Sequence, residues 1–360
     1  KIFPDKNNDW INLQNLQFKR GYPLILNSSS IFKINSNGLF TSRDAYVYSF
    51  NKNKLQNNMI KMYDFYNREV KKYSELTKSV IPKEFVKYDK TIISWSRALL
   101  ASIKNGKYKE YDSRNLKVAS YRPFCKQYVY YSNDFNECMY KTKKVFNEDN
   151  IVICIHGLNG NKPFSVLATN NLTDLNFMDA GVQCIPQYFY DINEEDNLFS
   201  NKHEILKNDN ITDKFLNTVR NYYKSIGISK DDIFNYIYGF LHSKDYQNKY
   251  VFDLKKNFPY IRLVNTFDDF ILFKEAGKKL ADLHLNYEIV KPYSKCNITA
   301  YTDASYKVTK MKFSNKGDKT SIDYNDRITI SNIPLKVYEY VVNGKSAIEW
   351  IMERYAVTTD

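Results

Sequence analysis

Apolar residues recur with a helical period over residues 51–76, and the positions between them are mostly Lys and Asn. The apolar positions lie three or four residues apart and are Leu55, Met59, Met62, Phe65 or Tyr66, and Val70. Side chains at this spacing share one face of a helix. The pattern therefore predicts an amphipathic helix with one face in a core and a Lys- and Asn-rich face in water.

Strand-like patterns surround this helix in the first 210 residues. Residues 30–50 contain two β-rich runs separated by the turn signal Asn35-Ser36-Asn37-Gly38. Residues 94–105 favour a helix that ends at Gly106. Further strands are predicted at 115–132, 150–157, 164–169 and 181–190.

The pattern changes near residue 211. Helices are predicted at 211–226, at 230–257 with a break near "HSKDY", and at 266–288, where Asp268-Asp269 occupies the favourable N-terminal end. Residues 297–331 favour a small antiparallel meander that turns at 315–318. The stretch 334–357 is predicted to be a helical pair split at Asn343-Gly344.

These elements predict an α+β protein: a mixed β-sheet part with inserted helices, then a helical part, then a small antiparallel meander with C-terminal helices. The expected units are a basic α+β subdomain at 1–210, a helical subdomain at 211–290 and the meander with its helices at 291–360. A chain of 360 residues is long enough for two or three such units.

Composition supports a folded chain away from membranes. Of all residues, 43% are hydrophobic and 16% aromatic, which argues against disorder. The sequence has no apolar run of eighteen residues and no signal-peptide core. Its five scattered cysteines, with no CxxC, favour reduced thiols in a cytoplasmic protein over disulfides or a zinc site. The first residue is Lys1 and not Met, so we expect a piece of a longer protein.

The positive charge is concentrated in one part of the sequence. Residues 1–130 contain 24 Lys and Arg against 10 Asp and Glu, whereas residues 131–360 contain 29 against 30. A basic segment beside a neutral one suits a surface that faces phosphates. A genome that favours Lys and Asn codons would also enrich lysine, but it explains the one-sided distribution poorly.

The stretch "SYRPFCKQYVYYS" (120–132) combines cations with aromatic rings. Treated as one strand, its alternation places five side chains on one face: Arg122, Phe124, Lys126, Tyr128 and Tyr130. That face would grip phosphates and stack on bases. The alternative is an ordinary sheet edge in which the tyrosines pack and keep their hydroxyls wet.

Two other segments offer groups that read base edges. Arg43 in "TSRDAY" either pairs with guanine or forms a structural ion pair near Asp44. The loop "GLNGNKPFSVLATNN" (157–171) carries amide side chains that can read adenine. The DNA-contact candidates are therefore Arg43, Arg122, Lys126, Tyr128, Tyr130, Asn159, Asn161 and Lys162.

Catalytic signatures are missing from the sequence. The stretch "ICIHGLNGN" (153–161) is similar to an oxyanion loop, but there is no GxSxG nucleophile elbow. A hydrolase that uses His156 is therefore the least favoured hypothesis. No phosphate loop, GxGxxG turn or HExxH motif is present, and the histidines and cysteines lack metal-ligand spacing. We expect no catalytic residue, metal site or cofactor in this chain, which is then no enzyme by itself.

The sequence resembles the C-terminal specificity region of Type ISP restriction–modification enzymes, which are single-polypeptide, ATP-driven restriction enzymes. The similar stretches occur in the expected order along nearly the whole chain: "FPDKNNDWIN" (3–12), "GLFTSRDAYVYSF" (38–50), "YRPFCKQYVYY" (121–131), "DIFNYIYGFLHSKDY" (232–246), "LADLHLNYE" (280–288) and "VYEYVVNGKSAIEWIMERYAV" (337–357). One departure is Tyr260, where the family usually has Arg after the proline.

The resemblance implies a target recognition domain that follows a nuclease, a helicase-like ATPase and an N6-adenine methyltransferase. The NPPY and glycine-rich motifs of the methyltransferase are missing here. S-adenosylmethionine, ATP and Mg²⁺ are implied for the parent enzyme only. The first hypothesis is a sequence-specific reader of double-stranded DNA that positions it for the methyltransferase. The alternative is a structural coupling module in which the near-neutral helical part at 211–290 docks neighbouring domains without base readout.

Overall fold

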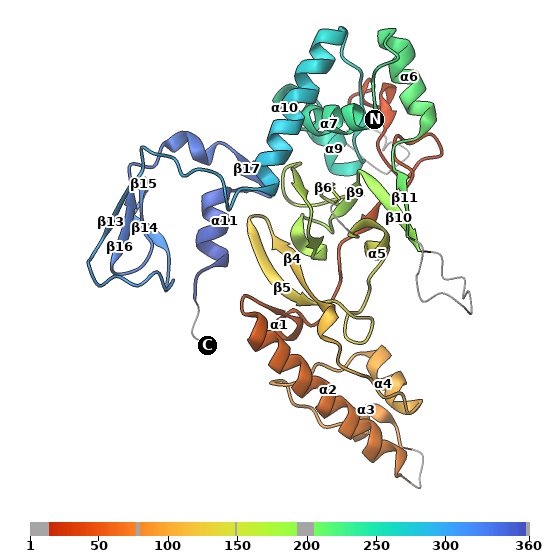
Figure 1. The fold of residues 1–360 in the computed structure, drawn as a ribbon, viewed down its shortest axis with the longest axis vertical. Coiled ribbons are helices and arrows are strands. Elements are labelled where there is room, and N and C mark those ends of the chain that lie inside the picture. Colours follow the sequence, from red (N-terminus) through yellow and green to blue (C-terminus); the bar gives the residue numbers. More distant parts are fainter. Residues whose placement is uncertain (1–13, 77–79, 148–149, 193–204, 358–360) are drawn as a thin grey trace, which may run out of the picture.

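The structure is a computed structural model, and it describes residues 14–76, 80–147, 150–192 and 205–357. Residues 3–12, the first of the family-like stretches, lie outside this part. Helices and sheets are mixed along the chain, which confirms the predicted α+β class (Figure 1). The helices are α1 (Asp44–Val47), α2 (Lys52–Ser74), α3 (Pro82–Phe85), α4 (Arg97–Lys104), α5 (Thr142–Val145), α6 (Asp213–Tyr223), α7 (Lys230–Leu241), α8 (Lys244–Lys249), α9 (Val251–Lys256), α10 (Phe267–Leu285) and α11 (Ala347–Arg354).

In the described ranges, three four-stranded sheets carry most of the strands. Their strand orders are β3-β5-β4-β8, β2-β9-β6-β7 and β13-β16-β15-β14. The first holds β3 (Tyr48–Ser49), β4 (Leu116–Arg122), β5 (Cys125–Tyr130) and β8 (Leu172–Thr173). The second holds β2 (Ser36–Asn37), β6 (Val152–Ile155), β7 (Val166–Thr169) and β9 (Gln183–Pro186). The third holds β13 (Asn297–Ala300), β14 (Lys312–Asn315), β15 (Asp318–Asp323) and β16 (Ile328–Ser331).

Short antiparallel pairs complete the strands. They are β1 (Tyr22–Pro23) with β12 (Tyr260–Ile261), β10 (Tyr188–Ile192) with β11 (Ile205–Asp209), and β17 (Val341–Val342) with β18 (Lys345–Ser346). In the part of the chain that the structure describes, no helix is long and apolar enough to cross a membrane.

Helix α2 forms as its pattern predicts. Asn51 caps it by accepting a hydrogen bond from the Lys54 amide, and the predicted apolar row is buried. That row packs against β4, β5 and the segment around Trp95 in one hydrophobic core. Helices α2, α3 and α4 together form a projection at one end of the long axis of the molecule (Figure 1).

A second core joins segments that are far apart in sequence. Apolar residues from 18–32 and from one face of the β6–β7–β9 sheet pack with residues of α6 to α10. Helix α7 crosses α10 closely at Gly239 and Gly277. A Cβ on Gly277 would lie 2.0 Å from the Asn235 carbonyl oxygen, so the crossing depends on the missing side chain.

The C-terminal part is attached through a third core. Val342 and Trp350 are buried with residues of the β6–β9 sheet, and the Trp350 indole N–H donates to the Val342 carbonyl at 2.7 Å. The sheet of β13 to β16 lies beside the rest of the molecule (Figure 1). As predicted, β14 turns into β15 around 315–318, although β13 pairs with β16 and so departs from a simple meander.

Three local predictions are wrong. Residues 35–38 do not form a turn, since Ser36–Asn37 is a strand that pairs with residues 183–184. The stretch 115–132 is a hairpin and not one strand, with Arg122 opposite Cys125. The C-terminal helical pair is a 3-10 helix, the β17–β18 hairpin turning at Asn343-Gly344, and α11.

Candidate nucleic-acid interface

Arg43 is buried and binds several parts of the backbone. Its side chain is 2% exposed. Nε donates to the Ser94 carbonyl at 2.9 Å and Nη1 to the Phe135 carbonyl at 2.9 Å, while Nη2 lies 3.5 Å from the Glu137 carboxylate. Burial lowers the pKa of the guanidinium. Arg43 therefore holds three segments together, and a base contact would require those bonds to break.

Arg122 is held by two carboxylates at the end of β4. Nη1 donates to Asp174 Oδ1 at 2.6 Å, and Nη2 lies 3.8 Å from Asp44 Oδ2. The guanidinium also stacks over the Tyr121 ring at 3.9 Å. Burial raises the pKa of Asp174 to about 6, although Arg122 acts in the opposite direction. The charge of Arg122 is thus balanced by carboxylates of the protein itself.

The hairpin corrects the predicted face of 120–132. Phe124 has a φ of 55°, and the chain reverses there, so Arg122 lies opposite Cys125 and the alternation starts again in β5. Residues directly opposite each other in a ladder share a face, and neighbours along a strand alternate. The register also shifts between Ser120, which pairs with Lys126, and Arg122, so the alternation of a single strand does not hold across the turn.

Lys126 and the two tyrosines of β5 contact the protein itself. Lys126 Nζ lies 2.8 Å from Glu288 and 4.9 Å from the Tyr287 ring centre, at the end of α10. Tyr130 is fully buried, and its hydroxyl donates to the Tyr63 hydroxyl at 3.1 Å. Tyr128 is half-buried against the α2 core. These contacts are those of a packed sheet and not of a stacking surface, although β5 lies between β3 and β4 and not at a sheet edge, and the Tyr130 hydroxyl is buried and not wet.

The loop between β6 and β7 presents its polar side chains to water. Asn159, Asn161 and Lys162 are exposed, and within the described ranges no hydrogen bond is recorded for their side chains. The loop backbone is nevertheless fixed. The Asn159 amide donates to the Lys255 carbonyl at 2.9 Å, and the Lys162 amide donates to Asp179 Oδ2 at 2.8 Å.

Asn343 of the β17–β18 hairpin supports the same region. Its amide N–H donates to Ser165 Oγ at 3.0 Å, and its side-chain amide donates to the Phe177 carbonyl at 3.2 Å. Gly160 fits tightly, since a Cβ there would lie 2.6 Å from Asp179 Oδ2. Fixed backbone with free amides is a geometry suited to reading base edges.

His156 is placed for packing and not for hydrolysis. It is buried against the Phe164 ring at 5.0 Å, and its Nδ1 lies 2.6 Å from the Gly157 carbonyl oxygen. Burial lowers its pKa. Among the described residues, no group of three or more His, Cys, Asp or Glu side chains could hold a metal ion.

Helix α2 and its neighbours carry cations that the candidate set left out. Twelve Lys and Arg side chains in the described part of 50–110 are exposed, against four Asp and Glu side chains. The exposed cations are Lys52, Lys54, Lys61, Arg68, Lys71, Lys72, Lys83, Lys87, Lys90, Arg97, Lys104 and Lys107. The Lys- and Asn-rich face of the predicted helix was the signal that could have identified them.

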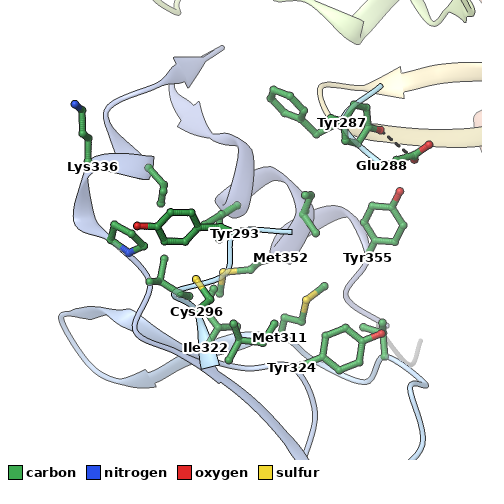
Figure 2. Close-up of a pocket in the computed structure, with 18 residues that line it drawn as sticks. Tyr287, Glu288, Tyr293, Cys296, Met311, Ile322, Tyr324, Lys336, Met352 and Tyr355 are labelled. Carbon is green, nitrogen blue, oxygen red and sulfur yellow. Dashed lines mark hydrogen bonds between the residues drawn. The ribbon is translucent and has the colours of Figure 1, made fainter. Parts of the chain in front are cut away.

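A cavity of about 800 Å³ lies in the C-terminal part, between α11 and the β13–β16 sheet (Figure 2). Its walls are mainly apolar and include Met311, Ile322, Tyr324 and Met352. Lys336 is the only cation that lines it in the described part of the chain. Such a surface does not suit a polyanion, so the cavity is not a candidate for DNA contact.

Comparisons with known proteins agree with the resemblance. Residues 30–360 match the family of the Type ISP C-terminal specificity domain. The chain is similar to a nuclease-deletion mutant of the Type ISP restriction–modification enzyme LlaGI in complex with a DNA substrate mimic, with 35% identity and a TM-score of 0.85. It is also similar to the ATP-dependent Type ISP enzyme LlaBIII bound to DNA, with 34% identity and a TM-score of 0.85.

A DrdV–DNA complex solved by cryo-electron microscopy is similar as well, with 27% identity and a TM-score of 0.86. Each similarity covers 100% of this chain but only 27%, 22% and 36%, respectively, of the LlaGI, LlaBIII and DrdV chains. No protein with a curated description matches the sequence.

Proposed function

The chain belongs to the Type ISP C-terminal specificity domain family, and we propose from this membership that it recognises a specific sequence in double-stranded DNA. The observation that carries the proposal is the full-length structural similarity to enzymes solved with DNA. The cationic surface of the first third of the chain supports it, because a DNA reader needs phosphate contacts for affinity.

The loop between β6 and β7 is the proposed reader of bases. Asn159 and Asn161 present amides that can pair with the N6 and N7 edge of adenine, and Lys162 adds a donor for guanine. Arg43 and Arg122 are proposed to hold the protein segments around them in position. Their N–H groups already donate to protein acceptors, the Phe135 carbonyl and the Asp174 carboxylate.

We also propose that the chain acts beside a methyltransferase domain and a helicase-like ATPase domain of one polypeptide. In this scheme the domain positions the target adenine for N6 methylation. S-adenosylmethionine, ATP and Mg²⁺ would be bound by those other domains, as the resemblance to Type ISP enzymes implies. The small share of each relative that this chain covers supports such a division of labour.

A second candidate function is structural coupling between domains. Exposed apolar side chains on the helical part favour it, among them Ile226 at 87%, Leu272 at 66% and Leu283 at 53% exposed. If coupling were the only function, Lys and Arg to Ala changes in 1–130 would leave DNA affinity untouched.

The test is selection from a random duplex library with the 360-residue chain, followed by affinity measurements at moderate salt. We expect a selected duplex to bind more tightly than a scrambled one. Asn159→Ala and Asn161→Ala should each reduce this preference by about 1–3 kcal/mol, with exposed Asn217→Ala on α6 as the matched control. Equal affinity of the wild-type chain for all duplexes would overturn the proposal.

A further inference from the structure

We infer that the exposed face of α2, with the adjoining segment 105–110, holds the phosphate backbone of duplex DNA independently of sequence. This inference rests on the proposed function and names the surface that supplies its non-specific affinity. None of its residues is among the DNA-contact candidates from the sequence. The assignment rests on the structure, in which most of the candidate cations form ion pairs within the protein.

Three of the four candidate cations, all except Lys162, are already paired inside the protein. Arg43 has Glu137, Arg122 has Asp174 and Asp44, and Lys126 has Glu288. Of the twelve exposed cations in 50–110, only Lys72 has a salt bridge within the described residues, to Glu69. The α2 surface therefore keeps a charge that no part of the described structure neutralises.

The cations on α2 form a row along the helix. Lys54, Lys61 and Arg68 follow one another at seven-residue intervals, which keeps them on one face. At a rise of 1.5 Å per residue they are about 10 Å apart along the axis. Asn57, Asp64 and Lys71 lie between them or extend the row. Duplex DNA has one charge per about 1.7 Å of its axis, so each cation in such a row can reach a phosphate.

The beginning of the helix carries charges of the unfavourable sign for its own stability. The first turn of α2 contains Lys52 and Lys54 and no acidic residue. Cations near the positive end of a helix oppose its dipole and destabilise the helix. An external polyanion would relieve this repulsion.

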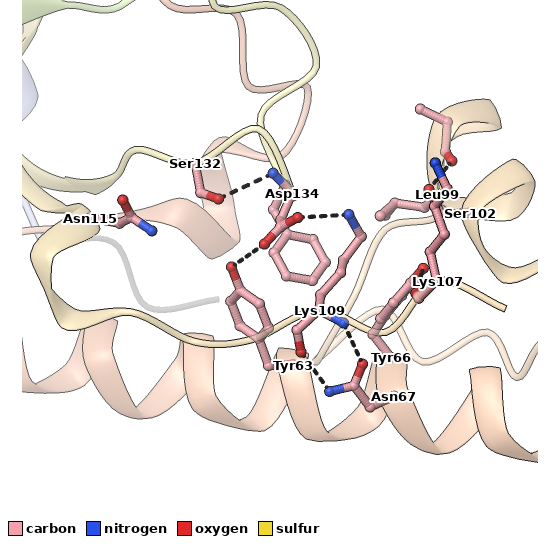
Figure 3. A network of polar contacts seen from close by, with 12 residues as sticks. Tyr63, Tyr66, Asn67, Leu99, Ser102, Lys107, Lys109, Asn115, Ser132 and Asp134 are labelled. Carbon is pink, nitrogen blue, oxygen red and sulfur yellow. Dashed lines mark hydrogen bonds and ion pairs between the residues drawn. The ribbon is translucent and has the colours of Figure 1, made fainter. Parts of the chain in front are cut away.

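The segment beside the row is held in a fixed position (Figure 3). The Asn67 side chain donates to the Lys109 carbonyl at 2.8 Å and accepts from the Lys109 amide at 3.0 Å. The Tyr66 hydroxyl donates to the Lys107 carbonyl at 2.9 Å, and Lys109 Nζ lies 2.8 Å from Asp134. These bonds place the segment against α2 before any ligand arrives.

A shallow hollow of about 470 Å³ lies at this junction. It is lined by Asp64, Asn67, Arg68, Lys71 and Tyr108. Two cations and an aromatic hydroxyl around a rigid hollow suit a phosphate and its sugar. Tyr108 is the one exposed aromatic ring on α2 and segment 105–110, whereas a single strand needs a series of rings on which successive bases stack. Duplex backbone is the partner that fits.

The test uses the exposed triple variant Lys54→Ala, Lys61→Ala and Arg68→Ala in the 360-residue chain. Affinity for an unrelated duplex is measured over a range of salt concentrations. Each lost phosphate contact lowers the salt slope by about 0.9, so we expect the slope to fall by about 3. The ratio of affinities for selected and scrambled duplexes should stay at the wild-type value.

Two control variants isolate the charge. Lys54→Arg, Lys61→Arg and Arg68→Lys together keep the charges and should keep the wild-type slope. Lys214→Ala, Lys278→Ala and Lys279→Ala together remove three exposed cations from α6 and α10 and should also keep it. A wild-type slope in the α2 alanine variant overturns the inference. The inference also fails if this variant loses binding to an acidic protein and keeps its binding to DNA. The proposed function fails on a different result, the absence of sequence preference in the wild-type chain.

Discussion

At the scale of single residues, Arg43 is a cation whose hydrogen bonds and ion pair are all made within the protein. Its guanidinium donates to carbonyl groups of loops that are 51 and 92 residues away in sequence. Both carbonyl oxygens would lose a partner if the side chain were removed. Buried acceptors without a partner cost about 1–3 kcal/mol each.

We therefore expect Arg43→Ala to lower the free energy of unfolding by about 3 kcal/mol, as measured by urea denaturation. Arg43→Lys should recover little of this, because an ammonium cannot reproduce the planar set of donors. The exposed change Arg97→Ala serves as the control. An Arg43→Ala chain of unchanged stability with relaxed sequence preference would instead make Arg43 a base reader.

The titration of Asp174 makes the free energy of unfolding depend on pH. Burial raises its pKa in the folded chain to about 6 from an ordinary value of 3.8. The folded state then binds the proton more tightly than the unfolded state does. The stability that comes from this proton is present in full below pH 4 and is lost as the pH rises through 6.

Asp174→Asn removes this titration while Asp44 remains as a partner for Arg122. From pH 5 to pH 7, the free energy of unfolding of the variant should gain about 1 kcal/mol relative to wild type. Denaturation curves at the two pH values measure it, with exposed Asp326→Asn as the control. A difference that does not change with pH would show that Asp174 stays ionised in the fold.

The sequence alone could not assign these residues. Arg43 and Arg122 have the chemistry of DNA contacts, and local spacing says nothing of Glu137 or Asp174, which the fold brings to them from 94 and 52 positions away. The proposed contacts of the eight candidate residues stay predictions. The exposed loop residues Asn159, Asn161 and Lys162 keep the geometry that such contacts require.

At the scale of elements, long periodic patterns were predicted well. The row of α2 and the acidic first turn of α10 both appear where the sequence places them. The hairpin at 116–130 was missed, although Pro123 is a turn signal, because Phe124 occupies a left-handed position that usually takes glycine. The Asn343-Gly344 pair is a strong hairpin signal that was interpreted as a break between helices.

The crossing of α7 and α10 offers a test at this scale. A Cβ on Gly277 would lie 2.0 Å from the Asn235 carbonyl and 2.7 Å from the Gly239 amide nitrogen. Both are backbone atoms, so the helices must move apart. We expect Gly277→Ala to lower the free energy of unfolding by about 3 kcal/mol despite the better helix propensity of Ala.

Gly227→Ala is the matched control for this prediction, because no atom lies within 4 Å of the Cβ it adds. Thermal or urea unfolding of both variants measures the difference. A Gly277→Ala chain as stable as the control chain would mean that the helices are not pressed together at this point.

At the scale of the whole molecule, two of the cores take residues from more than one of the predicted units, and the division into units stays a prediction. Phe18, Leu24 and Ile31 pack with Phe234 and Phe270 in one core, across position 210. In the third core, Phe124 and Val152 pack with Val342 and Trp350, across position 290. Short-range sequence patterns cannot predict such contacts, since they are formed by segments more than 100 residues apart.

Segments that share a core should lose their structure together. Native-state hydrogen exchange in increasing urea measures this for each amide. We expect the amides of β6 and of α7 to exchange with the same opening free energy, because Ile153 and Ile155 are buried against the helical part in one core. The short α3, which has no buried residue, should exchange through smaller openings and provides the internal control.

Loss of protection in α7 and α10 at a lower urea concentration than in β6 would instead support an independent helical unit at 211–290, as the sequence predicts. That outcome would also favour the coupling function, since a unit able to open by itself can transmit a change between domains. A single cooperative body is instead better suited to DNA recognition. It would hold the β6–β7 loop and helix α2 at a fixed distance on one duplex.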